Sequence, residues 1–374
     1  MIFLIFSFVV LLIFAVANVY IYKRLICKFF LFTHLKPLFI VIFSLLFICQ
    51  VFFLAVRKVE LLSNDIYSFL SMLYAPTYCL FFITLILDIL RLLYYFTGKQ
   101  KLKCPFTRSI FELLIIGLSS YLAYFSIYSA IKIPDIKEVE IKLPKLKQDL
   151  KIAMLTDIHL GKNLHKEFLN ALIEKVNAQN VDMVVIVGDL VDTNVKEIES
   201  YISDLDLFNT KFGVYYSLGN HEYYRGVYEI IELLKTKTKM NILINENIDL
   251  GFINIAGLGD LAGLQNRGIL GPDLQRVKVD MDFSKPSILL AHQPKTALLY
   301  DLSDFDLILS GHTHGGQIFP FMFLVELNQG FISGLHELGK QTQIFISTGA
   351  GFWGPSLRML TQSEIVILNL KGEK

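Results

Sequence analysis

Cysteine is scarce in this chain of 374 residues. No two of its cysteines have the C-x-x-C spacing, and all four lie in the first part of the sequence: Cys27, Cys49, Cys79 and Cys104. Frameworks for disulfide bonds or zinc are recognised by the count and spacing of cysteines, and neither pattern is met here. The sequence therefore predicts neither a disulfide-stabilised fold nor a zinc site with thiolate ligands.

Charged side chains are also few, and neither sign dominates. Only 18% of the residues are charged whereas 53% are apolar, which is too apolar for an ordinary soluble protein. The net charge of +1 provides no basic surface of the kind that nucleic-acid-binding proteins carry. Internal repeats and low-complexity tracts are absent as well. The composition thus argues against a nucleic-acid partner and points to a membrane.

The apolar excess is confined to residues 1–131, which we predict to be a transmembrane region. A helix needs about 20 apolar residues to cross a bilayer. Four runs are near or above this length: Ile2 to Tyr22, Pro37 to Val56, Ile66 to Tyr95 and Ile110 to Ile131. The first run has the position of a signal peptide, but no basic segment precedes its apolar part and further spans follow. We therefore expect four helices, with the first as an anchor.

Two acidic residues, Asp88 and Glu112, lie inside these apolar runs. An ionisable residue within a span often marks function. Asp88, however, has Arg91 one helical turn away, and both acids are placed where a span could end. We interpret both as structural.

The connections between the runs differ in their content of Lys and Arg. By the positive-inside rule, loops rich in these residues stay in the cytoplasm. The middle connection has only two, Arg57 and Lys58, whereas the first has four and the third has five: Lys23, Arg24, Lys28 and Lys36, then Arg91, Lys99, Lys101, Lys103 and Arg108. This pattern predicts a multi-pass protein of the cell inner membrane whose residues after Ile131 lie on the outer face.

A change of composition after Ile131 marks the start of a second region. Residues 132–149 are rich in Lys and Glu and are predicted to form a linker and an edge strand near Val139 to Leu143. Amphipathic helices such as Lys166 to Ala178 and Tyr228 to Thr236 then alternate with apolar strands. The alternation predicts a layered α/β domain over residues 150–374, with one sheet or two packed sheets at its centre. The expected strands are Ile152 to Thr156, Met183 to Val187, Val214 to Ser217, Ile253 to Ala256, Ile288 to Ala291, Leu307 to Ser310, Ile344 to Ser347 and Ile365 to Leu368.

Polar residues follow several of these strands at their carboxyl ends, where α/β folds collect functional groups. Two imidazoles occupy the glycine-flanked turn from Gly311 to Gln317, and neutral imidazole is the commonest metal ligand in proteins. The other strand ends carry these blocks: Asp157-Ile158-His159, Gly188-Asp189, Gly219-Asn220-His221-Glu222 and His292. The shared position of the blocks predicts a metal site.

These blocks, in this order, resemble those of the calcineurin-like metallophosphoesterase superfamily, which are D-x-H, G-D, G-N-H-[DE], H and G-H-x-H. The resemblance covers about residues 150–370, and every block is complete. It extends to a membrane-anchored group, whose motifs are similar to T-D-I-H-L-G, G-D-L-V-D, L-G-N-H-E, A-H-Q-P, S-G-H-T-H-G-G-Q and the tail from Gly349 to Pro355. The implied fold is an α/β metallophosphoesterase domain, a layered β-sandwich flanked by helices.

The resemblance implies a site with two divalent metal ions that share Asp189. The residues implied are Asp157, His159, Asp189 and His314 for one ion, and Asp189, Asn220, His292 and His312 for the other. A carboxylate has two oxygens to share, and ligands that are all nitrogen or oxygen suit manganese, iron or zinc. We favour manganese, and we count Asp189 with His221 as catalytic.

His221 is the candidate for direct chemistry on the substrate. In the family the matching histidine contacts the phosphate or assists the leaving group as an acid, which implies the same role here, with Glu222 or Asp192 as orienting partner. Asp192 could instead cap a helix that begins at Val195. Asn220 is expected to contact metal and substrate rather than to serve only as a turn former, because it shares a strand end with His221.

Arg358, which follows the glycine-rich tail, has two interpretations. It is either a guanidinium fork that binds the phosphate of the substrate or a plain surface charge. His165 and His336 lie outside the five blocks and are interpreted as ordinary surface residues.

The apolar segment from Ile318 to Val325 follows the His-Thr-His turn directly. It is either a buried strand or loop, or an exposed lip that touches the bilayer or holds acyl chains. Together with the four spans, it favours a phospholipid-like or nucleotide-sugar lipid as substrate.

Some members of the membrane-anchored group are similar to enzymes of lipid A synthesis that hydrolyse the pyrophosphate of UDP-2,3-diacylglucosamine to UMP and 2,3-diacylglucosamine 1-phosphate. We predict this reaction, although its substrate is made in the cytoplasm while the loop charges place the domain outside. The two inferences agree only if one run, most readily the fourth, does not cross the bilayer. The alternatives are a periplasmic or extracellular phosphodiesterase for another lipid-linked phosphate, and an inactive membrane scaffold, against which the complete ligand set argues. The sequence does not indicate an oligomeric state.

Overall fold

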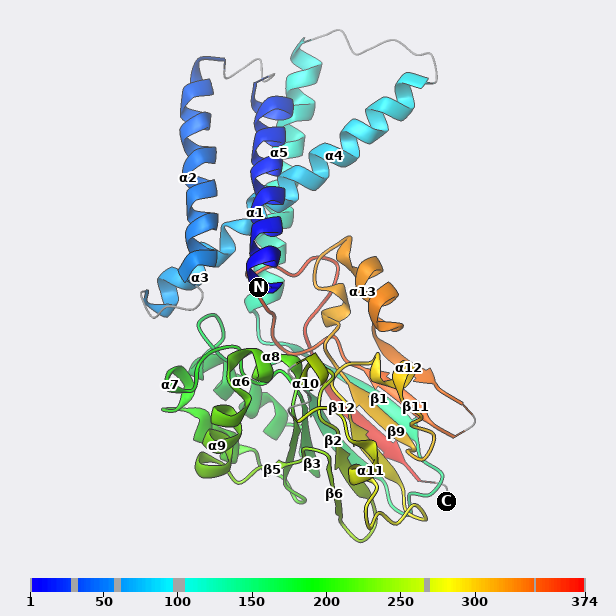
Figure 1. Ribbon diagram of the computed structural model, residues 1–374. Helices are drawn as coiled ribbons and strands as arrows, with labels where there is room; N and C mark the ends of the chain where they lie inside the picture. Colours follow the sequence, from blue (N-terminus) through cyan, green and yellow to red (C-terminus); the bar gives the residue numbers. More distant parts are fainter. Residues whose placement is uncertain are drawn as a thin grey trace. The chain divides into compact units, whose positions relative to one another are not determined.

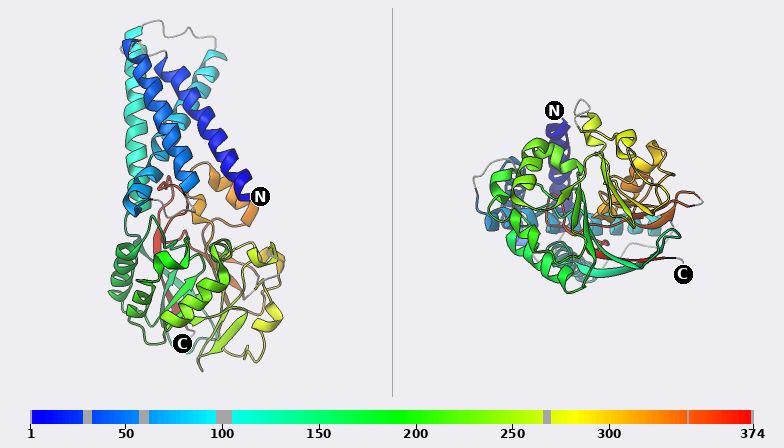
Figure 2. Two further views of the ribbon diagram at one scale, coloured as in Figure 1. Left: turned by 60° about the vertical axis from the view of Figure 1, so that its left-hand side comes forward. Right: turned by 90° about the horizontal axis from the view of Figure 1, so that it is seen from below.

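The computed structural model of the protein describes residues 2–27, 33–56, 62–96, 105–265, 270–339 and 341–372. Figures 1 and 2 show its helices and strands. Two compact units make up the chain: one comprises Met1–Ser129 with Gly354–Leu357, and the other comprises Ala130–Trp353 with Arg358–Lys374. Several residues considered above lie outside the described ranges: Lys28, Arg57, Lys58, Lys99, Lys101, Lys103 and Cys104.

Helices form the first unit. Its elements are α1 (Ile2–Ile21), the π-helix η1 (Tyr22–Ile26), the short η2 (Thr33–Leu35), α2 (Lys36–Ala55), α3 (Asn64–Met72), α4 (Tyr74–Phe96) and α5 (Pro105–Ile131), whose last residues belong to the second unit. Four stretches are long and apolar enough to cross a membrane: Ser7–Ile26, Lys36–Ala55, Asn64–Tyr94 and Ser109–Ile131. The prediction of four spans is thereby confirmed. The described cysteines are free thiols, namely Cys27, Cys49 and Cys79.

The third span consists of two helices, α3 and α4, which meet at Leu73 instead of forming the one predicted helix. Pro76 explains the break, because it has no N–H to donate to the carbonyl of Met72. Gln50 of α2 donates its Nε2–H to the carbonyl oxygen of Leu73 at 3.1 Å and to the hydroxyl of Thr77 at 2.9 Å. A side chain from a neighbouring helix thus binds the carbonyl of the residue at which the two helices meet, which suits an apolar surrounding.

The two acidic residues of the apolar runs differ in their surroundings. Asp88 on α4 forms ion pairs with Arg24 and, at 3.3 Å, with Arg91, and it accepts a hydrogen bond from the Tyr20 hydroxyl at 2.6 Å. The expected pairing of Asp88 with Arg91 is thus present, and its interpretation as structural stays a prediction. Glu112 is buried within the 27-residue helix α5, which runs without the interruption that a re-entrant segment would need.

Two six-stranded sheets form the second unit. The first has the strand order β1-β12-β2-β3-β4-β5, and the second has the order β10-β11-β9-β8-β7-β6. The strands are β1 (Asp135–Lys142), β2 (Leu150–Leu155), β3 (Met183–Val187), β4 (Val214–Ser217), β5 (Asn241–Ile242), β6 (Glu246–Asp249), β7 (Asn254–Gly257), β8 (Ser287–Leu290), β9 (Leu307–Ser310), β10 (Gly334–Glu337), β11 (Gln343–Ile346) and β12 (Glu364–Lys371). The short strands β5, β6 and β10 had no counterpart in the sequence-based prediction.

Helices and helical turns cover both sheets. They are α6 (Lys166–Asn177), α7 (Val195–Ile198), η4 (Ile202–Leu207), α8 (Asn220–Arg225), α9 (Val227–Lys237), α10 (Ala262–Gln265), α11 (Leu274–Val277), α12 (Thr296–Leu299), η5 (His314–Gly316) and α13 (Phe321–Gln329). The two predicted amphipathic helices correspond to α6 and α9.

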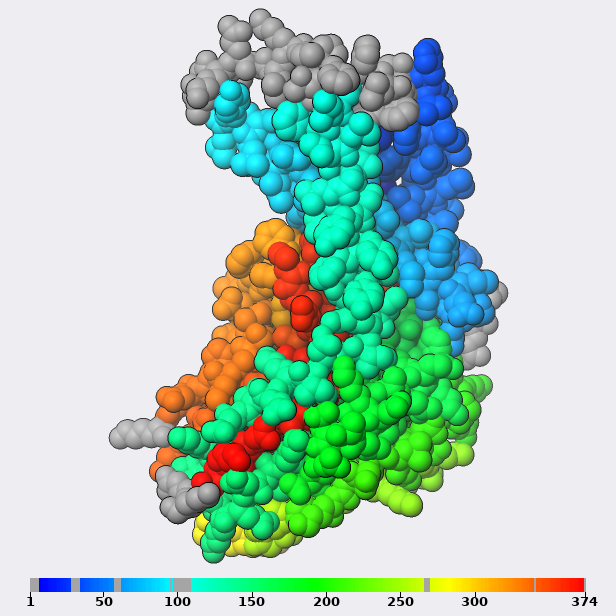
Figure 3. Space-filling model, turned by 180° about the vertical axis from the view of Figure 1, so that it is seen from behind, coloured from blue at the N-terminus to red at the C-terminus, as the bar shows by residue number. Residues whose placement is uncertain are grey.

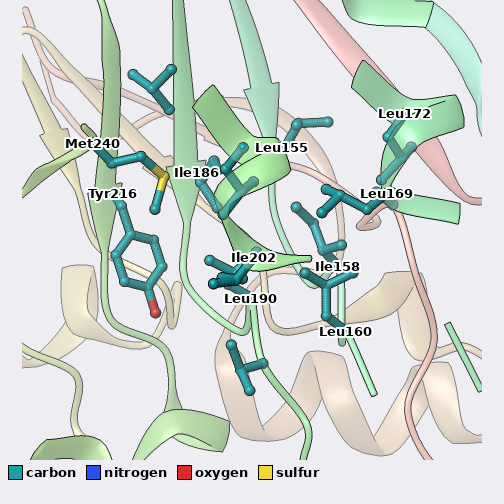
Figure 4. Close-up of a cluster of buried hydrophobic side chains, with 14 of the residues drawn as sticks. Leu155, Ile158, Leu160, Leu169, Leu172, Ile186, Leu190, Ile202, Tyr216 and Met240 are labelled. Carbon is teal, nitrogen blue, oxygen red and sulfur yellow. The ribbon is translucent and has the colours of Figure 1, made fainter. Parts of the chain in front are cut away.

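Three clusters of buried apolar side chains join the layers. The first lies between the sheets and takes residues from both, such as Ile152 of β2 and Ile288 of β8. The second packs the first sheet against α6 and α9, and Figure 4 shows Leu169 and Leu172 of α6 in it. The third covers the second sheet under α11 and α12. Burial on both faces explains why a strand such as β3 is apolar throughout, and the predicted layered β-sandwich flanked by helices is confirmed.

The directions of the strands bring many loops together at one edge. β2, β3 and β4 run parallel, so they end at the same edge of the first sheet, which we call its carboxyl edge. β12 lies between β1 and β2 and runs antiparallel to β2, so it begins at this edge. β1 is parallel to β12 and begins there too; Figure 3 shows the teal β1 beside the red β12. In the second sheet, β7, β8 and β9 are likewise parallel.

The apolar segment after the His-Thr-His turn forms a helix and not a strand. Ile318 makes an isolated bridge to Met359, and α13 begins at Phe321. The helix leaves several apolar side chains exposed to solvent, among them Phe323 and Leu324. The alternative of a buried strand or loop is therefore wrong, and the alternative of an exposed apolar segment holds.

Candidate metal centre

All five polar blocks lie where a strand of one of the two sheets ends. Asp157 and His159 follow β2, Asp189 follows β3, and the Asn220–His221 pair opens α8 directly after β4. The second sheet contributes the loops after β8 and β9, with His292, His312 and His314. The predicted metal ligands are buried except His312, which is partly exposed. The fold thus gathers side chains from five separate loops into one site.

One group within this site comprises Asp157, His159 and His314. The Nε2 atom of His314 lies 3.1 Å from Oδ1 of Asp157 and 3.1 Å from Nε2 of His159. Nε2 of His159 is also 3.8 Å from Oδ2 of Asp189. These four residues are those predicted for the first metal ion.

A second group comprises Asp189, His292 and His312, whose ligand atoms lie within 4.8 Å of one another. Nε2 of His292 is 3.2 Å from Oδ2 of Asp189. Asp189 therefore has close contacts with imidazoles of both groups, which is the arrangement that a bridging carboxylate needs. A third, overlapping group of His159, Asp189 and His221 extends the site toward His221.

The backbone at these residues has an unusual conformation. Positive φ angles occur at five of the seven predicted ligands: Asp157 (53°), His159 (53°), Asp189 (50°), His312 (68°) and His314 (49°). Residues other than glycine rarely adopt this left-handed region, and such outliers concentrate at functional sites. Two adjoining glycines allow the loops of the site to approach one another closely. A Cβ on Gly219 would lie 2.3 Å from the backbone nitrogen of Asp189, and a Cβ on Gly311 would lie 2.0 Å from Oγ1 of Thr156.

Hydrogen bonds fix the orientation of the carboxylates and of one imidazole. Asp157 accepts from the hydroxyl of Thr156 at 2.8 Å and from the backbone N–H of His312 at 2.9 Å. Oδ1 of Asp189 accepts from the N–H of His221 at 2.8 Å. Nδ1 of His292 lies 2.8 Å from the carbonyl oxygen of Val187, which can only accept, so Nδ1 carries a proton and Nε2 faces Asp189.

Several buried polar atoms at the site have no hydrogen-bond partner among the described residues. They include Oδ1 of Asn220, Nδ1 of His159 and Nη1 of Arg358. Buried polar atoms are normally paired, and exceptions call for an unseen ion or water. The residues fit divalent metal ions, because carboxylate, amide oxygen and imidazole converge and no thiolate is present.

The charge states of the site also suit metal ions. Burial would raise the pKa of Asp157, but His314 and His292 lower it, and the net result lies well below its ordinary value. Asp189 behaves likewise, through His292 and His221. Burial lowers the pKa of His159 and of His312 to about 3. At pH 7 these carboxylates are therefore ionised and these two imidazoles are neutral, which are the forms that bind metal.

Metal binding at pH 7 is expected to release about one proton, and His292 is its source. Burial alone would lower the pKa of His292, but Asp189 and Asp157 raise it well above its ordinary value. A proton on Nε2 then occupies the space between His292 and Asp189 in the metal-free protein, and a metal ion must displace it. His292 holds this proton at any pH below its raised pKa. The apparent affinity for the metal ion is therefore expected to rise with pH and to level off above the pKa of His292.

Titration calorimetry of the metal-free, detergent-solubilised protein with Mn²⁺, in buffers of different ionisation enthalpy, measures this proton. The slope of binding enthalpy against buffer ionisation enthalpy gives the number released. The variant His336→Asn changes a histidine outside the site and is expected to leave the slope unaltered. A binding enthalpy that does not depend on the buffer contradicts the prediction.

His221 is held by Asp192 and not by Glu222. Nδ1 of His221 lies 2.7 Å from Oδ1 of Asp192, which also accepts from Nε and Nη2 of Arg225 at 3.1 and 2.9 Å. The cap of α7 is Asn194, so the capping interpretation of Asp192 is wrong.

Glu222 joins the loops that follow β3 and β4. It is fully buried and accepts hydrogen bonds from the backbone N–H groups of Asp189, Val191 and Gly219 at 3.2, 3.0 and 2.8 Å. Burial raises the pKa of Glu222 to about 7. The carboxyl group therefore anchors the backbone on either side of the site, a role that the sequence did not reveal.

Arg358 is fully buried, so its interpretation as a plain surface charge is wrong. Its Nε and Nη2 donate to the carbonyl oxygen of Gly351, and Nη2 also donates to that of Thr348 at 2.7 Å. Nη2 lies 3.0 Å from Nδ1 of His314, whereas Nη1 has no hydrogen-bond partner among the described residues. Burial lowers the pKa of Arg358 to about 10, which leaves a cation beside the site at pH 7. Contact with a phosphate stays a prediction.

Two residues near the site were not predicted. Asp260 follows β7, is buried, and accepts from the N–H of Ala262 and from Nε2 of Gln293, both at 2.8 Å. Burial raises the pKa of Asp260 to about 6. The pair Gly259-Asp260 repeats at this strand end the Gly-Asp pattern found after β3, which was the available signal. Tyr224 presents a ring that is 46% exposed and 5.5 Å from the His221 ring.

The sandwich of two sheets and its cluster of His and Asp side chains define a metal-dependent phosphoester hydrolase. Residues 150–316 match the family described as calcineurin-like phosphoesterase. The chain is also 62% identical to an uncharacterised metallophosphoesterase of Campylobacter jejuni over 375 residues, which is 100% of both chains. It belongs to the calcineurin-like metallophosphoesterases, and the superfamily resemblance is confirmed.

Other relatives extend the family across bacteria and animals. An uncharacterised metallophosphoesterase of Helicobacter pylori is 44% identical over 276 residues, which cover 73% of this chain and 72% of that protein. A transmembrane protein with metallophosphoesterase domain from Danio rerio is 33% identical over 272 residues, which cover 69% of this chain and 62% of that protein. With its four apolar spans, the chain is an integral membrane protein of this family.

Proposed function

We propose that this phosphoesterase hydrolyses a phosphoester or pyrophosphate that is attached to a membrane lipid. The observation that carries the proposal is the combination of the buried His and Asp cluster with four apolar spans in one chain. The last span ends at Ile131 and the first strand of the catalytic domain begins at Asp135, so the domain is tethered close to the bilayer. A substrate that resides in the membrane would be within its reach.

Two divalent metal ions, manganese in preference to iron or zinc, are part of the proposal. One would be held by Asp157, His159, Asp189 and His314, and the other by Asp189, Asn220, His292 and His312. The groups found around Asp189 and the unpartnered Oδ1 of Asn220 support this assignment. When bound, such a pair supplies a water of lowered pKa as nucleophile and neutralises charge on the phosphoryl oxygens.

His221 would act on the phosphate or on the leaving group. Its ring is buried, lies 4.5 Å from the ring of His159, and is held through Nδ1 by Asp192, while Nε2 lies 4.0 Å from Oδ2 of Asp189 inside the metal centre. From Nε2 it would donate a hydrogen bond to a phosphoryl oxygen or a proton to the departing oxygen. Asn220, through its side-chain amide, and Arg358, through its cationic charge, are the further groups we assign to substrate binding.

The specific substrate we propose is UDP-2,3-diacylglucosamine, a nucleotide-sugar lipid of lipid A synthesis. Water would add across its P–O–P bond to give UMP and 2,3-diacylglucosamine 1-phosphate. This assignment rests on the sequence motifs and the membrane anchor, and it requires the domain to lie on the cytoplasmic face of the inner membrane.

A second candidate is a phosphodiesterase that acts outside the cytoplasm on another lipid-linked phosphate. It is favoured by the loop charges, because the first and third connections are richer in Lys and Arg than the second. The inactive scaffold, by contrast, is not supported, because the family membership indicates a working hydrolase.

Release of UMP from UDP-2,3-diacylglucosamine by the detergent-solubilised protein with Mn²⁺ tests the specific proposal. Release that is lost in the variant Asp189→Asn supports it. If UMP is not released, but bis(p-nitrophenyl) phosphate is cleaved in a manner that requires Asp189, the lipid A substrate is rejected and the second candidate is retained.

A further inference from the structure

Helix α13 carries an exposed apolar face, in which the ring of Phe323 contacts that of Phe319 edge-on. The side chains of Phe323, Leu324 and Leu327 are 61%, 62% and 84% exposed. At 3.6 residues per turn they lie within about 100° of one another around the helix axis. We call these three residues the α13 face. Apolar side chains grouped in this way on the surface mark an interaction site more often than scattered ones do.

The opposite side of α13 packs on the catalytic domain and holds the helix in place. A Cβ on Gly316 would lie 2.5 Å from Cβ of Met322, so this side chain sits against the turn that carries His314. Gln329 is 5% exposed and accepts from the N–H of Lys295. The α13 face is thus presented by a helix fixed to the metal centre, and not by a free loop.

The chain enters the catalytic domain at the edge that carries the metal centre. Asp135, the first residue of β1, is opposite Glu364, the first residue of β12. β12 runs antiparallel to β2, with Val366 opposite Met154, so Glu364 lies near the end of β2 from which Asp157 follows. Only residues 132–134 separate α5 from β1.

α13 lies at this edge as well. It begins shortly after His314, at the ends of the strands of the second sheet. The carbonyl oxygen of Thr348 accepts from Arg358, and the backbone N–H of Thr348 donates to the carboxylate of Glu364 at the start of β12. Figure 1 shows α8 and α13 at one end of the domain and the C-terminus at the other. The start of β1, the metal centre and α13 therefore share one end of the catalytic domain.

We propose that the α13 face inserts into the interfacial layer of the bilayer that holds the spans of the same chain. A connection of three residues reaches at most about 14 Å, which keeps this end of the domain at the membrane surface. An apolar helical face held at that distance gains stability by burying its side chains at the boundary of headgroups and acyl chains. The inference concerns where the domain rests and does not require a lipid substrate.

Quenching of tryptophan fluorescence by brominated lipids tests the proposal in the full-length protein. The chain has one tryptophan, Trp353, and its hydrogen bonds with Gln317 are made by its backbone. Trp353→Phe keeps these bonds and removes the native fluorescence, so each probe can be introduced as the single tryptophan. Leu324→Trp and, separately, Leu327→Trp place the probe on the α13 face. Leu207→Trp is the matched control, because Leu207 is 60% exposed and its carbonyl accepts from Asn177 at the far end of α6.

In phosphatidylcholine–phosphatidylglycerol vesicles with acyl chains brominated near the headgroup, fluorescence at positions 324 and 327 is expected to fall by about twofold or more. The control at 207 is expected to change little. Hydrolysis of bis(p-nitrophenyl) phosphate by each variant checks that the domain is folded. Equal quenching at all three positions, or none at 324 and 327, overturns the proposal. A third outcome also overturns the proposal: the tryptophan emission maximum shifts to shorter wavelength as the protein-to-lipid ratio rises, but the brominated lipids do not quench it. That result assigns the α13 face to contact with a second copy of the chain.

Discussion

Replacement of Asp189 by Asn is expected to lower kcat/KM for any phosphodiester at least about 10³-fold, because it removes the one carboxylate shared by both groups of ligands. The substitution keeps the volume of the side chain but replaces an anionic oxygen with an NH₂ group, which cannot bind a cation. Oδ2 of Asp189 faces Nε2 of His292 at 3.2 Å and Nε2 of His159 at 3.8 Å, so both groups are affected. Steady-state kinetics with bis(p-nitrophenyl) phosphate and Mn²⁺ measure the loss.

Asp273→Asn is the matched control for this substitution. Asp273 is exposed and caps α11 by accepting from the N–H of Arg276, a role that asparagine also fills. The control is expected to retain full activity. Retention of more than about a tenth of the activity in Asp189→Asn would show that this residue is not shared by two metal ions, given the size of the effect expected from a metal clamp.

Replacement of His221 by Asn is expected to lower kcat by about 10² to 10⁴ with a poor leaving group while metal affinity is kept. His221 approaches Asp189 no closer than 4.0 Å through Nε2 and is turned toward Asp192, so it is the member of the site that the ions need least. An acid helps most when the leaving oxygen is strongly basic. The loss with an alkyl phosphodiester is therefore expected to exceed the loss with bis(p-nitrophenyl) phosphate.

The comparison of these two substrates distinguishes the role of the residue. Equal losses for both would contradict a role as acid and leave contact with the phosphate as the explanation. A fall in Mn²⁺ affinity, measured by calorimetry, would instead make His221 a metal ligand. His336→Asn again serves as the control, because the His336 side chain contacts the backbone of Ser333 and the ring of Phe331, which lie outside the metal centre.

The strand ends of the metal centre could be predicted from the sequence because each has a simple signature. A short apolar run, buried on both faces, stops at a polar block, and parallel strands place their blocks on one edge. Asp157, Asp189 and His292 were found in this way. Gly259-Asp260 carries the same signature at the end of β7 but belongs to none of the five blocks.

Other features could not be predicted because the sequence has no local signal for them. An arginine after a glycine-rich tail looks the same whether it is exposed or, as Arg358 is, fully buried. Asp192 and Asn194 are both suitable residue types for a helix N-cap, and only the folded loop shows that Asn194 caps α7. The run that forms α13 is too short and too uniformly apolar for its period to distinguish helix from strand. Left-handed backbone at residues such as Asp157 and His314 is imposed by the packing of five loops.

The position of β12 in the first sheet has a consequence for biogenesis. β12 fills the place between β1 and β2, yet it follows β2 in the chain by about 200 residues. While the nascent chain is being made, the helices before β1 are available for insertion, but β1 and β2 each present an open strand edge that can pair wrongly. At that stage the loop after β2 also lacks the residues it will pack against. In the folded protein the carbonyl of Thr156 accepts from the N–H of Ala350, and the adjoining Gly349 accepts from the N–H of Glu364 of β12. Maturation of the enzyme is therefore a late step, set by the closing of this sheet and not by entry of its helices into the membrane.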